Sequence, residues 1–346
     1  MPYLMNGWYM AAFSDEVGER PIERTLLDIP VVLYRLPNGK AVALHDRCPH
    51  RFAPLSEGLL VGSELQCPYH GLRFGADGAC VHNPHGPVPK SARVRSFPIH
   101  EQYGLIWFWP GDPEKADPDM LPDLLFLEEN GGNSVVFGHL HVDGNYQLVV
   151  DNLLDLTHAP YLHPQFAVPG VSTEERLNQT KTKLIRDGDR VSAMRWRPDS
   201  EPNAPTRTIF GFTDERMDSR SHMHWYPPSL IHFDLGAAPV GGSEHAGLCI
   251  PALHAITPES ELSCHYFFAQ ARNVKPGDPD VDRALLELLD TAFRDQDEPM
   301  IERQQRRMGS VSDLAELDPI LLKTDAAPVE ARRVLARLIA EEKAEA

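Results

Sequence analysis

Short stretches of apolar and polar residues fill the first third of the chain. Residues 29–36 and 41–46 are two such stretches joined by an Asn-Gly turn, which predicts a β-hairpin. Further apolar runs lie within 71–82 and 93–112, bounded by glycine and proline. Short strands at this spacing predict a small β-sandwich or barrel.

A segment rich in proline and aspartate follows, at residues 111–123 ("GDPEKADPDMLPD"). This composition is typical of a linker between domains. We therefore expect a first domain over residues 1–115 and a second domain over residues 116–346.

The second domain mixes helical and strand patterns. Residues 145–159 have the length and periodicity of a helix, and residues 181–196 predict a hairpin around an Asp-Gly turn. Amphipathic helices are predicted over 279–308 and 328–346. Four more apolar segments predict strands, at 221–226, 230–235, 247–254 and 262–269. This order predicts an α+β domain built on an antiparallel sheet.

The composition argues against several classes of protein. With 346 residues, 42% of them hydrophobic, the chain is long enough for two packed domains. Its formal charge of −17 argues against nucleic acid or an anionic membrane surface as a partner. No run approaches the ~20 apolar residues of a membrane helix, and the N-terminus carries no export signal. Five cysteines form a sparse, odd set that suits a reducing compartment, so we expect a cytoplasmic protein.

Two of the cysteines stand beside histidines in a regular pattern. Cys48 and His50 form C-x-H, and after sixteen intervening residues Cys67 and His70 form C-x-x-H. Two thiolates and two imidazoles suit a tetrahedral zinc ion or a Rieske [2Fe–2S] cluster, in which the cysteines bind one iron and the histidines the other. Zinc sites usually pair cysteine with cysteine and histidine with histidine, so the mixed pairs favour the cluster.

A second set of candidate ligands lies in "DNLLDLTHAPYLH", residues 151–163. Asp155 and His158 are three residues apart on one face of the predicted helix, and His163 follows Pro160, which bends or ends a helix. Two histidines and a carboxylate are the ligands of mononuclear non-haem Fe(II), with positions left open for O2 and substrate. Taken alone, H-x4-H is as consistent with structural histidines.

The succession of CPHR, CPYHG and D-N-L-L-D-L-T-H-A-x-Y-x-H resembles the oxygenase component of the Rieske non-haem iron oxygenases, and within them the vanillate O-demethylase and dicamba demethylase group. The likeness extends from "NGWYMAAF" near the N-terminus through "HAITPESELSCHYFF" to the last helix. It implies an all-β Rieske domain that holds the [2Fe–2S] cluster. A catalytic helix-grip (START-like) domain with a mononuclear Fe(2+) would follow.

The resemblance places the third iron ligand on an aspartate of the late helix. The competing acids there are Asp290, Asp295, Asp297, Glu298 and Glu302. At 100° per residue, Asp297 falls on the apolar face defined by Leu286, Leu289, Phe293, Met300 and Ile301. The family pattern of an acid just ahead of "MIE" also selects Asp297. The alternative is an ordinary acid at a helix start ahead of Pro299.

The resemblance also assigns roles to Asp155 and Asn152. The matching aspartate of the family bridges a Rieske histidine of one subunit and an iron-binding histidine of the next. This implies a homotrimer in which Asp155 contacts the partner subunit's His70. Asp155 is otherwise an acid that caps nearby backbone groups, and Asn152 either borders the iron or is a polar surface residue.

For the substrate, the resemblance implies a small aromatic acid. His254 in "HAITPE" matches a histidine that contacts the substrate carboxylate in dicamba demethylases, and His232 lies near a position that holds an asparagine there. Both residues are equally consistent with strand histidines whose hydrogen bonds are satisfied by neighbours.

The implied reaction uses O2 to hydroxylate a methyl or methoxy carbon, and a hydroxylated methoxy group collapses to a phenol and formaldehyde. Aryl-methyl or ring hydroxylation, and a Rieske electron-transfer protein without oxygenase activity, are the alternatives. The sequence has no G-x-G-x-x-G after a strand, no P-loop and no second cysteine cluster, so a partner must deliver the electrons of NAD(P)H. The resemblance implies a reductase with flavin and a [2Fe–2S] centre, or a ferredoxin.

Overall fold

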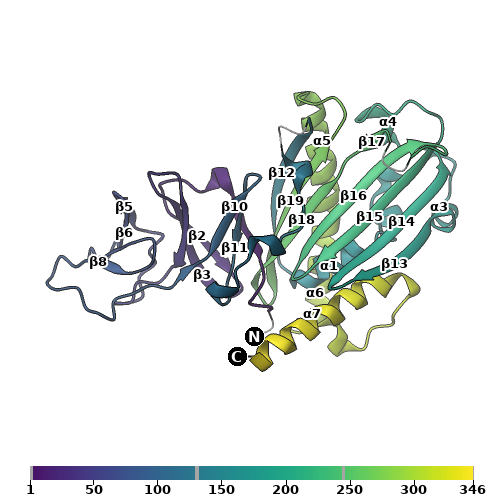
Figure 1. The fold of residues 1–346 in the computed structure, drawn as a ribbon. Coiled ribbons are helices and arrows are strands. Elements are labelled where there is room, and N and C mark those ends of the chain that lie inside the picture. The colour runs from purple at the N-terminus through teal and green to yellow at the C-terminus, as the bar shows by residue number, and fades with distance from the viewer. Residues whose placement is uncertain (1–2, 129–131, 244–245, 346) are drawn as a thin grey trace. The chain divides into compact units, whose positions relative to one another are not determined.

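The computed structural model describes residues 3–128, 132–243 and 246–345. The chain forms two compact units, each described separately below (Figure 1). The first holds the chain up to Leu121 together with residues 257–260, and the second holds Pro122–Ile256 and Glu261–Ala344. Among the described residues, no helix is both long and apolar enough to cross a membrane.

The first unit is built from three small antiparallel sheets. Their strand orders are β1-β11-β10, β2-β3-β4-β9 and β5-β6-β7-β8. The strands are β1 (Tyr9–Phe13), β2 (Ile22–Leu26), β3 (Ile29–Arg35), β4 (Ala41–His45), β5 (Leu59–Val61), β6 (Glu64–Gln66), β7 (Arg73–Phe74), β8 (Cys80–His82), β9 (Ser96–Phe97), β10 (Ile99–Gln102) and β11 (Leu105–Phe108). The predicted hairpin over 29–46 is confirmed as β3 and β4, which pair from Val31 opposite His45 to Arg35 opposite Ala41.

The apolar runs of the sequence form the packed core of this unit. All four residues of β11 are buried, and so is Trp109 just after the strand. A second apolar cluster contains Cys48 and Cys67 beside aliphatic and aromatic residues such as Leu65 and Phe74. The two cysteines are therefore anchored in packed core, which fixes the loops that follow them.

The second unit is an antiparallel sheet covered by helices. The strand order is β12-β19-β18-β16-β15-β14-β13, with β17 paired to β16. The strands are β12 (Ser134–Val142), β13 (Lys181–Asp187), β14 (Arg190–Ser200), β15 (Met217–Tyr226), β16 (Leu230–Pro239), β17 (Leu248–Cys249), β18 (Ala252–Ser260) and β19 (Ser263–Arg272). The predicted hairpin over 181–196 is confirmed, because Asp187 lies opposite Arg190 at the turn between β13 and β14.

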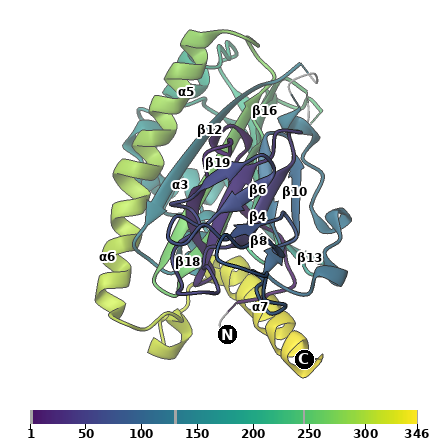
Figure 2. The same ribbon diagram turned by 90° about the vertical axis from the view of Figure 1, so that its left-hand side faces the viewer.

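The α-helices of this unit lie between its strands and after the last of them in the chain. They are α1 (Tyr146–Leu154), α2 (Ala159–Leu162), α3 (Thr173–Gln179), α4 (Ala204–Thr208), α5 (Pro279–Ala292), a π-helix (Phe293–Asp297), α6 (Glu298–Met308) and α7 (Ala326–Glu345). Single 3-10 turns lie at Ser14–Glu16, Pro113–Lys115, Pro118–Met120, Leu125–Leu127, Pro164–Phe166, Leu314–Leu317 and Lys323–Asp325. The α5 and α6 helices run one after the other alongside the sheet and pack on β12 (Figure 2).

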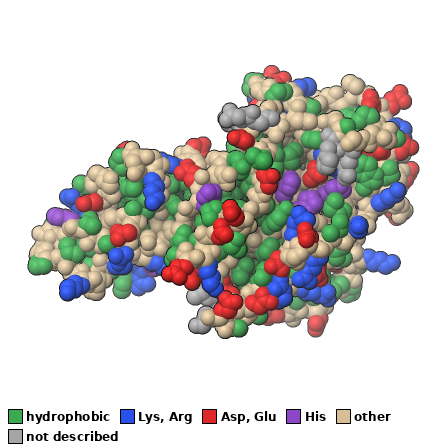
Figure 3. Space-filling model, in the orientation of Figure 1, with side chains coloured by type: hydrophobic (Ala, Val, Ile, Leu, Met, Phe, Trp, Pro, Cys, Tyr) green, Lys and Arg blue, Asp and Glu red, His purple; other side chains and the backbone are tan. Residues whose placement is uncertain are grey.

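The surface does not concentrate the negative charge of the chain on the face shown in Figure 3. Acidic and basic side chains are interspersed there, and apolar residues lie between them. The net charge of −17 is a property of the whole chain, and the face in Figure 3 shows no single acidic docking surface.

Candidate metal centres

The first helix of the second unit ends earlier than its sequence pattern predicts. The predicted helix is confirmed as α1 over Tyr146–Leu154, but its predicted continuation to residue 159, with Asp155 and His158 on one helical face, is wrong. The Asp155 carboxylate accepts hydrogen bonds from the Thr157 backbone N–H and from its hydroxyl, both at 2.9 Å. A side chain that bonds the backbone two residues ahead offers an alternative to helical bonding, so the chain turns at Asp155.

This turn fixes the ring of His158. Its Nδ1 lies 2.6 Å from the backbone carbonyl oxygen of Asp155, so the ring donates Nδ1–H to that oxygen and keeps the Nε2 lone pair free. Within the chain, therefore, the Asp155 carbonyl orients His158, while the Asp155 carboxylate bonds Thr157.

The second histidine ring is held from a different part of the chain. Pro160 lies in the first turn of α2 rather than ending a helix, and His163 follows the last residue of that helix. His163 is 4% exposed, and its Nδ1 lies 2.7 Å from Oε1 of Gln296. Gln296 is itself held by Gln165 through two amide hydrogen bonds of 2.9 and 3.1 Å. Neither glutamine was predicted from the sequence, because they lie 131 residues apart in the chain and no local motif links them.

A π-helical turn carries the carboxylate. In this turn the Glu298 N–H bonds the Phe293 carbonyl oxygen, five residues back, instead of four. The extra residue changes the phase of the helix, so the predicted apolar face is wrong at Met300, which is 46% exposed, although Ile301 is 3% exposed. Asp297 ends the π-helix and is buried.

Three ligand atoms converge at the end of this turn. Nε2 of His158 lies 3.3 Å from Nε2 of His163, and Oδ1 of Asp297 lies 3.4 Å and 3.3 Å from these two nitrogens. Among the residues that the structure describes, this is the only group of three or more His, Cys, Asp or Glu side chains close enough to hold one metal ion. Asn152 Nδ2 donates a hydrogen bond of 3.1 Å to the same Oδ1.

The donor atoms of this triangle fit a metal ion. Neighbouring ligands of an ion with bonds of about 2.1 Å lie about 3.0 Å apart in octahedral and about 3.4 Å apart in tetrahedral geometry, and the three observed edges lie within this range. Burial lowers the pKa of His158 against the opposing charge of Asp297. For His163 burial also lowers the pKa, but the hydrogen bond and charge of Asp297, with Gln296, raise it overall. The two Nε2 atoms and the buried carboxylate oxygen together form a donor set that suits a metal cation.

The other acids of the late helix do not take part in the triangle. Asp290 pairs with Arg294 at 3.5 Å and is about half exposed, and Asp295 is exposed. Glu302 pairs with Arg306 at 3.6 Å. Glu298 is half-buried, and burial raises its pKa.

The two cysteine loops of the first unit have the same backbone design. The N–H of Cys48 bonds the Ala53 carbonyl oxygen at 2.9 Å, and the N–H of Cys67 bonds the Leu72 carbonyl oxygen at 2.8 Å, five residues ahead in both cases. The residue before each acceptor has positive φ, +61° at Phe52 and +74° at Gly71. The left-handed residue lets each loop close tightly above its cysteine.

The side chains of these loops face one another. The His50 and His70 rings are 4.4 Å apart between centroids, and both cysteines are 1% exposed. Burial, with the neighbouring Cys67 thiol, raises the pKa of Cys48 to about 11, so a bound cation would be needed to stabilise the Cys48 thiolate. Two buried cysteines beside two facing histidines are the ligand set of a Rieske [2Fe–2S] cluster.

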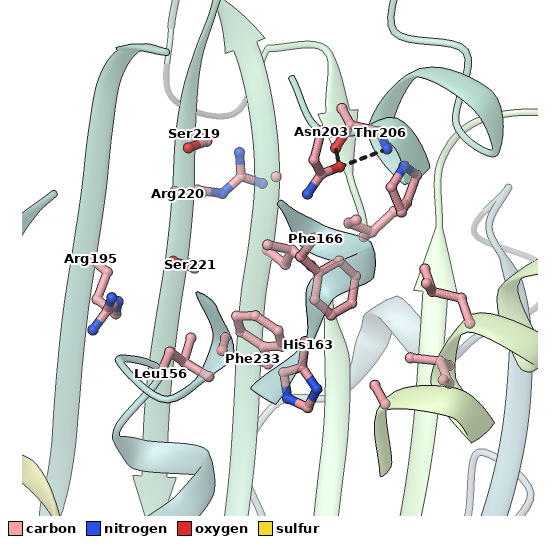
Figure 4. A pocket seen from close by; sticks show the side chains of 18 of the residues that line it. Leu156, His163, Phe166, Arg195, Asn203, Thr206, Ser219, Arg220, Ser221 and Phe233 are labelled. Carbon is pink, nitrogen blue, oxygen red and sulfur yellow. Dashed lines mark hydrogen bonds between the residues drawn. The ribbon is translucent and has the colours of Figure 1, made fainter. Parts of the chain in front are cut away.

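A largely apolar pocket opens beside the His158–His163–Asp297 triangle. Asn152, Phe166, Phe233 and His254 are among the residues that line it, and Figure 4 shows Phe166 and Phe233 close to His163. His254 is 1% exposed, and its Nδ1 lies 2.8 Å from the Tyr266 hydroxyl. Its buried Nε2 has no hydrogen-bond partner among the described residues.

The other predicted substrate residue occupies a different place. His232 is not among the described residues that line this pocket. It lies one position from Phe233, on the opposite face of β16, and its ring stacks on Phe126 at 4.8 Å between centroids.

Comparisons with known proteins agree with both centres. Residues 7–98 match the Rieske [2Fe-2S] domain, and residues 142–341 match the vanillate O-demethylase oxygenase C-terminal domain. The chain is 39% identical over 340 residues, 98% of each chain, to the dicamba O-demethylase oxygenase component of Stenotrophomonas maltophilia. The chain belongs to the Rieske oxygenases of the vanillate and dicamba O-demethylase group. The predicted Rieske domain and helix-grip catalytic domain are confirmed.

Two further similarities bear on cofactor and substrate. A solved structure of dicamba monooxygenase with non-haem iron and dicamba covers the whole of both chains at 36% identity, with a TM-score of 0.85. A putative toluene-4-sulfonate monooxygenase system iron-sulfur subunit of Comamonas testosteroni is 35% identical over 97% of each chain. As a Rieske oxygenase component, the protein carries a [2Fe–2S] cluster and a mononuclear non-haem iron, and a reductase or ferredoxin supplies its electrons.

Proposed function

We propose that this oxygenase component catalyses oxidative O-demethylation of a small methoxylated aromatic acid. The observation that carries the proposal is the triangle of His158, His163 and Asp297 at the wall of an apolar pocket. Relatives named as dicamba and vanillate O-demethylases support the choice of reaction.

The two metal centres would use different residues of the chain. Cys48 and Cys67 would bind one iron of the cluster, and His50 and His70 the other. His158, His163 and Asp297 would hold the mononuclear iron. When bound, this iron supplies O2 activation: with two electrons and two protons, one oxygen atom enters a substrate C–H bond and the other leaves as water. On a methoxy carbon the resulting hemiacetal breaks its C–O bond and releases a phenol and formaldehyde.

The chain's own residues prepare the centre for this chemistry. The Asp155 carbonyl and Gln296 each accept the Nδ1–H of one histidine, so both rings present Nε2 in the correct tautomer. Asn152 donates to Asp297 Oδ1 and limits the rotation of that carboxylate. Phe166, whose ring lies edge-on 5.7 Å from His163, would shield one side of the centre from water.

His254 is our candidate for substrate recognition in the same pocket. Its unpartnered Nε2 is a buried polar atom that a substrate group would satisfy. Burial lowers its pKa to about 3, so the ring is neutral at physiological pH and suits a neutral hydrogen-bonding group better than an ion pair. His232, on the opposite face of β16, would act on the substrate only indirectly.

Hydroxylation of an aryl methyl group is the second candidate reaction. It is favoured by the toluene-4-sulfonate monooxygenase relative, whose name specifies an aromatic compound with a methyl group instead of a methoxy group. The two reactions begin with the same C–H hydroxylation, and only the methoxy product falls apart.

The assembly belongs to the same proposal. We propose a Rieske domain over residues 1–115 and a catalytic domain over 116–346, acting as a homotrimer in which Asp155 links the iron centre to the partner subunit's His70. A flavin and [2Fe–2S] reductase would dock near the exposed His50.

A substrate panel tests the reaction directly. The holoenzyme with a reductase and NADH is incubated with matched pairs of methoxylated and methylated aromatic acids. O-demethylation predicts one formaldehyde per NADH with the methoxy compounds. If the methyl compounds give benzylic alcohols and no methoxy compound is turned over, the proposed O-demethylation is wrong and aryl-methyl hydroxylation takes its place.

A further inference from the structure

Four arginines are among the described residues that line the pocket; Arg220 pairs with Asp234 at 2.7 Å, and the other three have no such acid partner among the described residues. Arg195 and Arg197 belong to β14 and Arg176 to α3. Because residues two apart on a strand face the same way, Arg195 and Arg197 both face the pocket, as do Ser219 and Ser221 of the adjacent β15. Figure 4 shows Arg195 and Ser221 on neighbouring strands, to one side of His163.

Arg195 is a buried cation with open hydrogen-bonding capacity. The residue is 7% exposed. Its backbone N–H bonds Nδ1 of His222, but its guanidinium has no hydrogen-bond acceptor among the described parts of the chain. A guanidinium has five N–H donors, and a buried charge without such partners is costly. The side chain therefore has the donors that an anionic ligand would use.

The other two arginines leave most of their donors open as well. Arg197 donates from Nε to the Thr180 hydroxyl at 3.0 Å, and Arg176 donates to the Phe166 carbonyl oxygen at 2.5 Å. Neither forms an ion pair with an acid within the described residues. Asp155 is the acid whose charge raises the pKa of Arg195, against the larger effect of burial.

Burial and the mutual repulsion of these cations lower the pKa of Arg197. Burial contributes most, followed by the charges of Arg176 and Arg195, and the pKa falls to about 10. All three side chains remain protonated at neutral pH. A cluster of like charges at the wall of an apolar pocket destabilises the ligand-free protein, and an anion between them would relieve the repulsion.

We propose that Arg195 and Arg197, with Arg176 beside them, form an anion site that binds the acidic group of the substrate, a carboxylate or a sulfonate. That the bound anion is the substrate rests on the proposed function. Guanidinium forks match planar and tetrahedral oxyanions through paired hydrogen bonds. The apolar remainder of the pocket, including Phe166, Phe210 and Phe233, suits the aromatic ring.

This assignment separates two recognition tasks. The arginines take the charged end of the substrate, whereas the neutral His254 takes an uncharged polar group. An anchored acidic group would set which carbon of the ring system reaches the metal centre, because rigid placement of a substrate selects the bond that reacts.

Calorimetric titration of the holoenzyme under anaerobic conditions tests the site without turnover. The probes are benzoate, benzenesulfonate and the uncharged benzamide. We expect R195Q to weaken binding of the preferred anion at least 10-fold and R195Q/R197Q to weaken it further, with benzamide binding unchanged. R195K keeps the charge but loses the fork, so it should fall between wild type and R195Q. The stronger of the two wild-type anions identifies the acid class.

The matched control is R190Q, on the same strand but outside the pocket lining, which should bind all three probes like wild type. Wild-type anion affinity in R195Q and in R197Q, or an equal loss for benzamide, would overturn the anion site. If R195Q fails to fold, the partly exposed R197Q carries the test alone.

Formaldehyde release from 4-methoxybenzoate separates this inference from the proposed function. Arginine-dependent anion binding without any turnover would refute O-demethylation and leave the anion site standing. Formaldehyde release by R195Q together with unchanged anion affinity would refute the anion site and leave O-demethylation standing.

Discussion

Oε1 of Gln296 lies 2.7 Å from Nδ1 of His163, and the next residue, Asp297, places Oδ1 3.3 Å from Nε2 of the same ring. One π-helical turn therefore both orients a histidine and supplies the carboxylate beside it. Replacement of partners that orient metal-binding histidines typically weakens metal binding 10- to 100-fold.

We expect Q296L to weaken binding of the mononuclear iron by about 10- to 100-fold, because His163 loses the acceptor that fixes its tautomer. Iron titration of apoprotein, followed by metal analysis, measures this effect. D295N, at the exposed neighbouring position, is the matched control. Unchanged iron affinity in Q296L would show that His163 is held well enough by its packing.

D297A should remove the mononuclear iron and leave the Rieske cluster in place, because the carboxylate belongs to the triangle and lies in the other unit from Cys48 and Cys67. The iron content should fall from about three to about two per chain, with the visible spectrum of the cluster unchanged and turnover lost. Three iron atoms per chain in the variant would refute Asp297 as a ligand.

D155N should stop product formation while the reductase still reduces the cluster. The amide that replaces the carboxylate retains an oxygen that can accept the Thr157 N–H, so the local turn should persist, but the charge needed for a bridge between subunits is lost. Stopped-flow bleaching of the cluster and single-turnover product yield measure the two steps separately. T157A removes the hydroxyl bond to Asp155 without removing the charge, and it should keep most of the activity. Wild-type yield in D155N would mean that electrons take another route.

The purified chain should form no product from NADH, O2 and an aromatic acid until a reductase is added. With limiting reductase, turnover should fall as salt rises, because the encounter of this −17 protein with basic residues of a donor is screened beyond about 10 Å at 0.1 M salt. Steady-state rates over a salt series test this, with saturating reductase as the control. Turnover by homogeneous protein alone would contradict it.

His254 should make the protein less stable as the pH falls below about 6.5. Burial lowers its folded-state pKa from the usual 6.5 to about 3, so in this range the unfolded chain binds a proton that the folded chain does not. The free energy of unfolding should lose about 1.4 kcal/mol per pH unit from this residue. Denaturant unfolding at several pH values gives the free energy of unfolding as a function of pH. The slope of this function should be shallower for H254Q than for wild type, even if the two proteins differ in absolute stability. Parallel slopes would show that His254 titrates normally.

The sequence by itself determined the cofactor motifs and the fold class. Cys48 with His50, and Cys67 with His70, are spaced by two or three residues, so the covalent chain alone keeps each pair in one loop. The hairpins over 29–46 and 181–196 were predictable for the same reason: their turns and alternating strands are local signals.

Tertiary structure alone decided how the centre is completed. The bond between His163 and Gln296 spans 133 residues, and that between Asn152 and Asp297 spans 145, so no local pattern specifies them. The π-helical turn shifts the phase of the late helix, which a constant 100° per residue cannot represent. The end of α1 at Leu154 depends on a competition between helical bonding and the Asp155 side chain. The pairing of β14 with β15 brings the pocket arginines beside the serines because strand register, set by packing across the sheet, decides which distant side chains share a face.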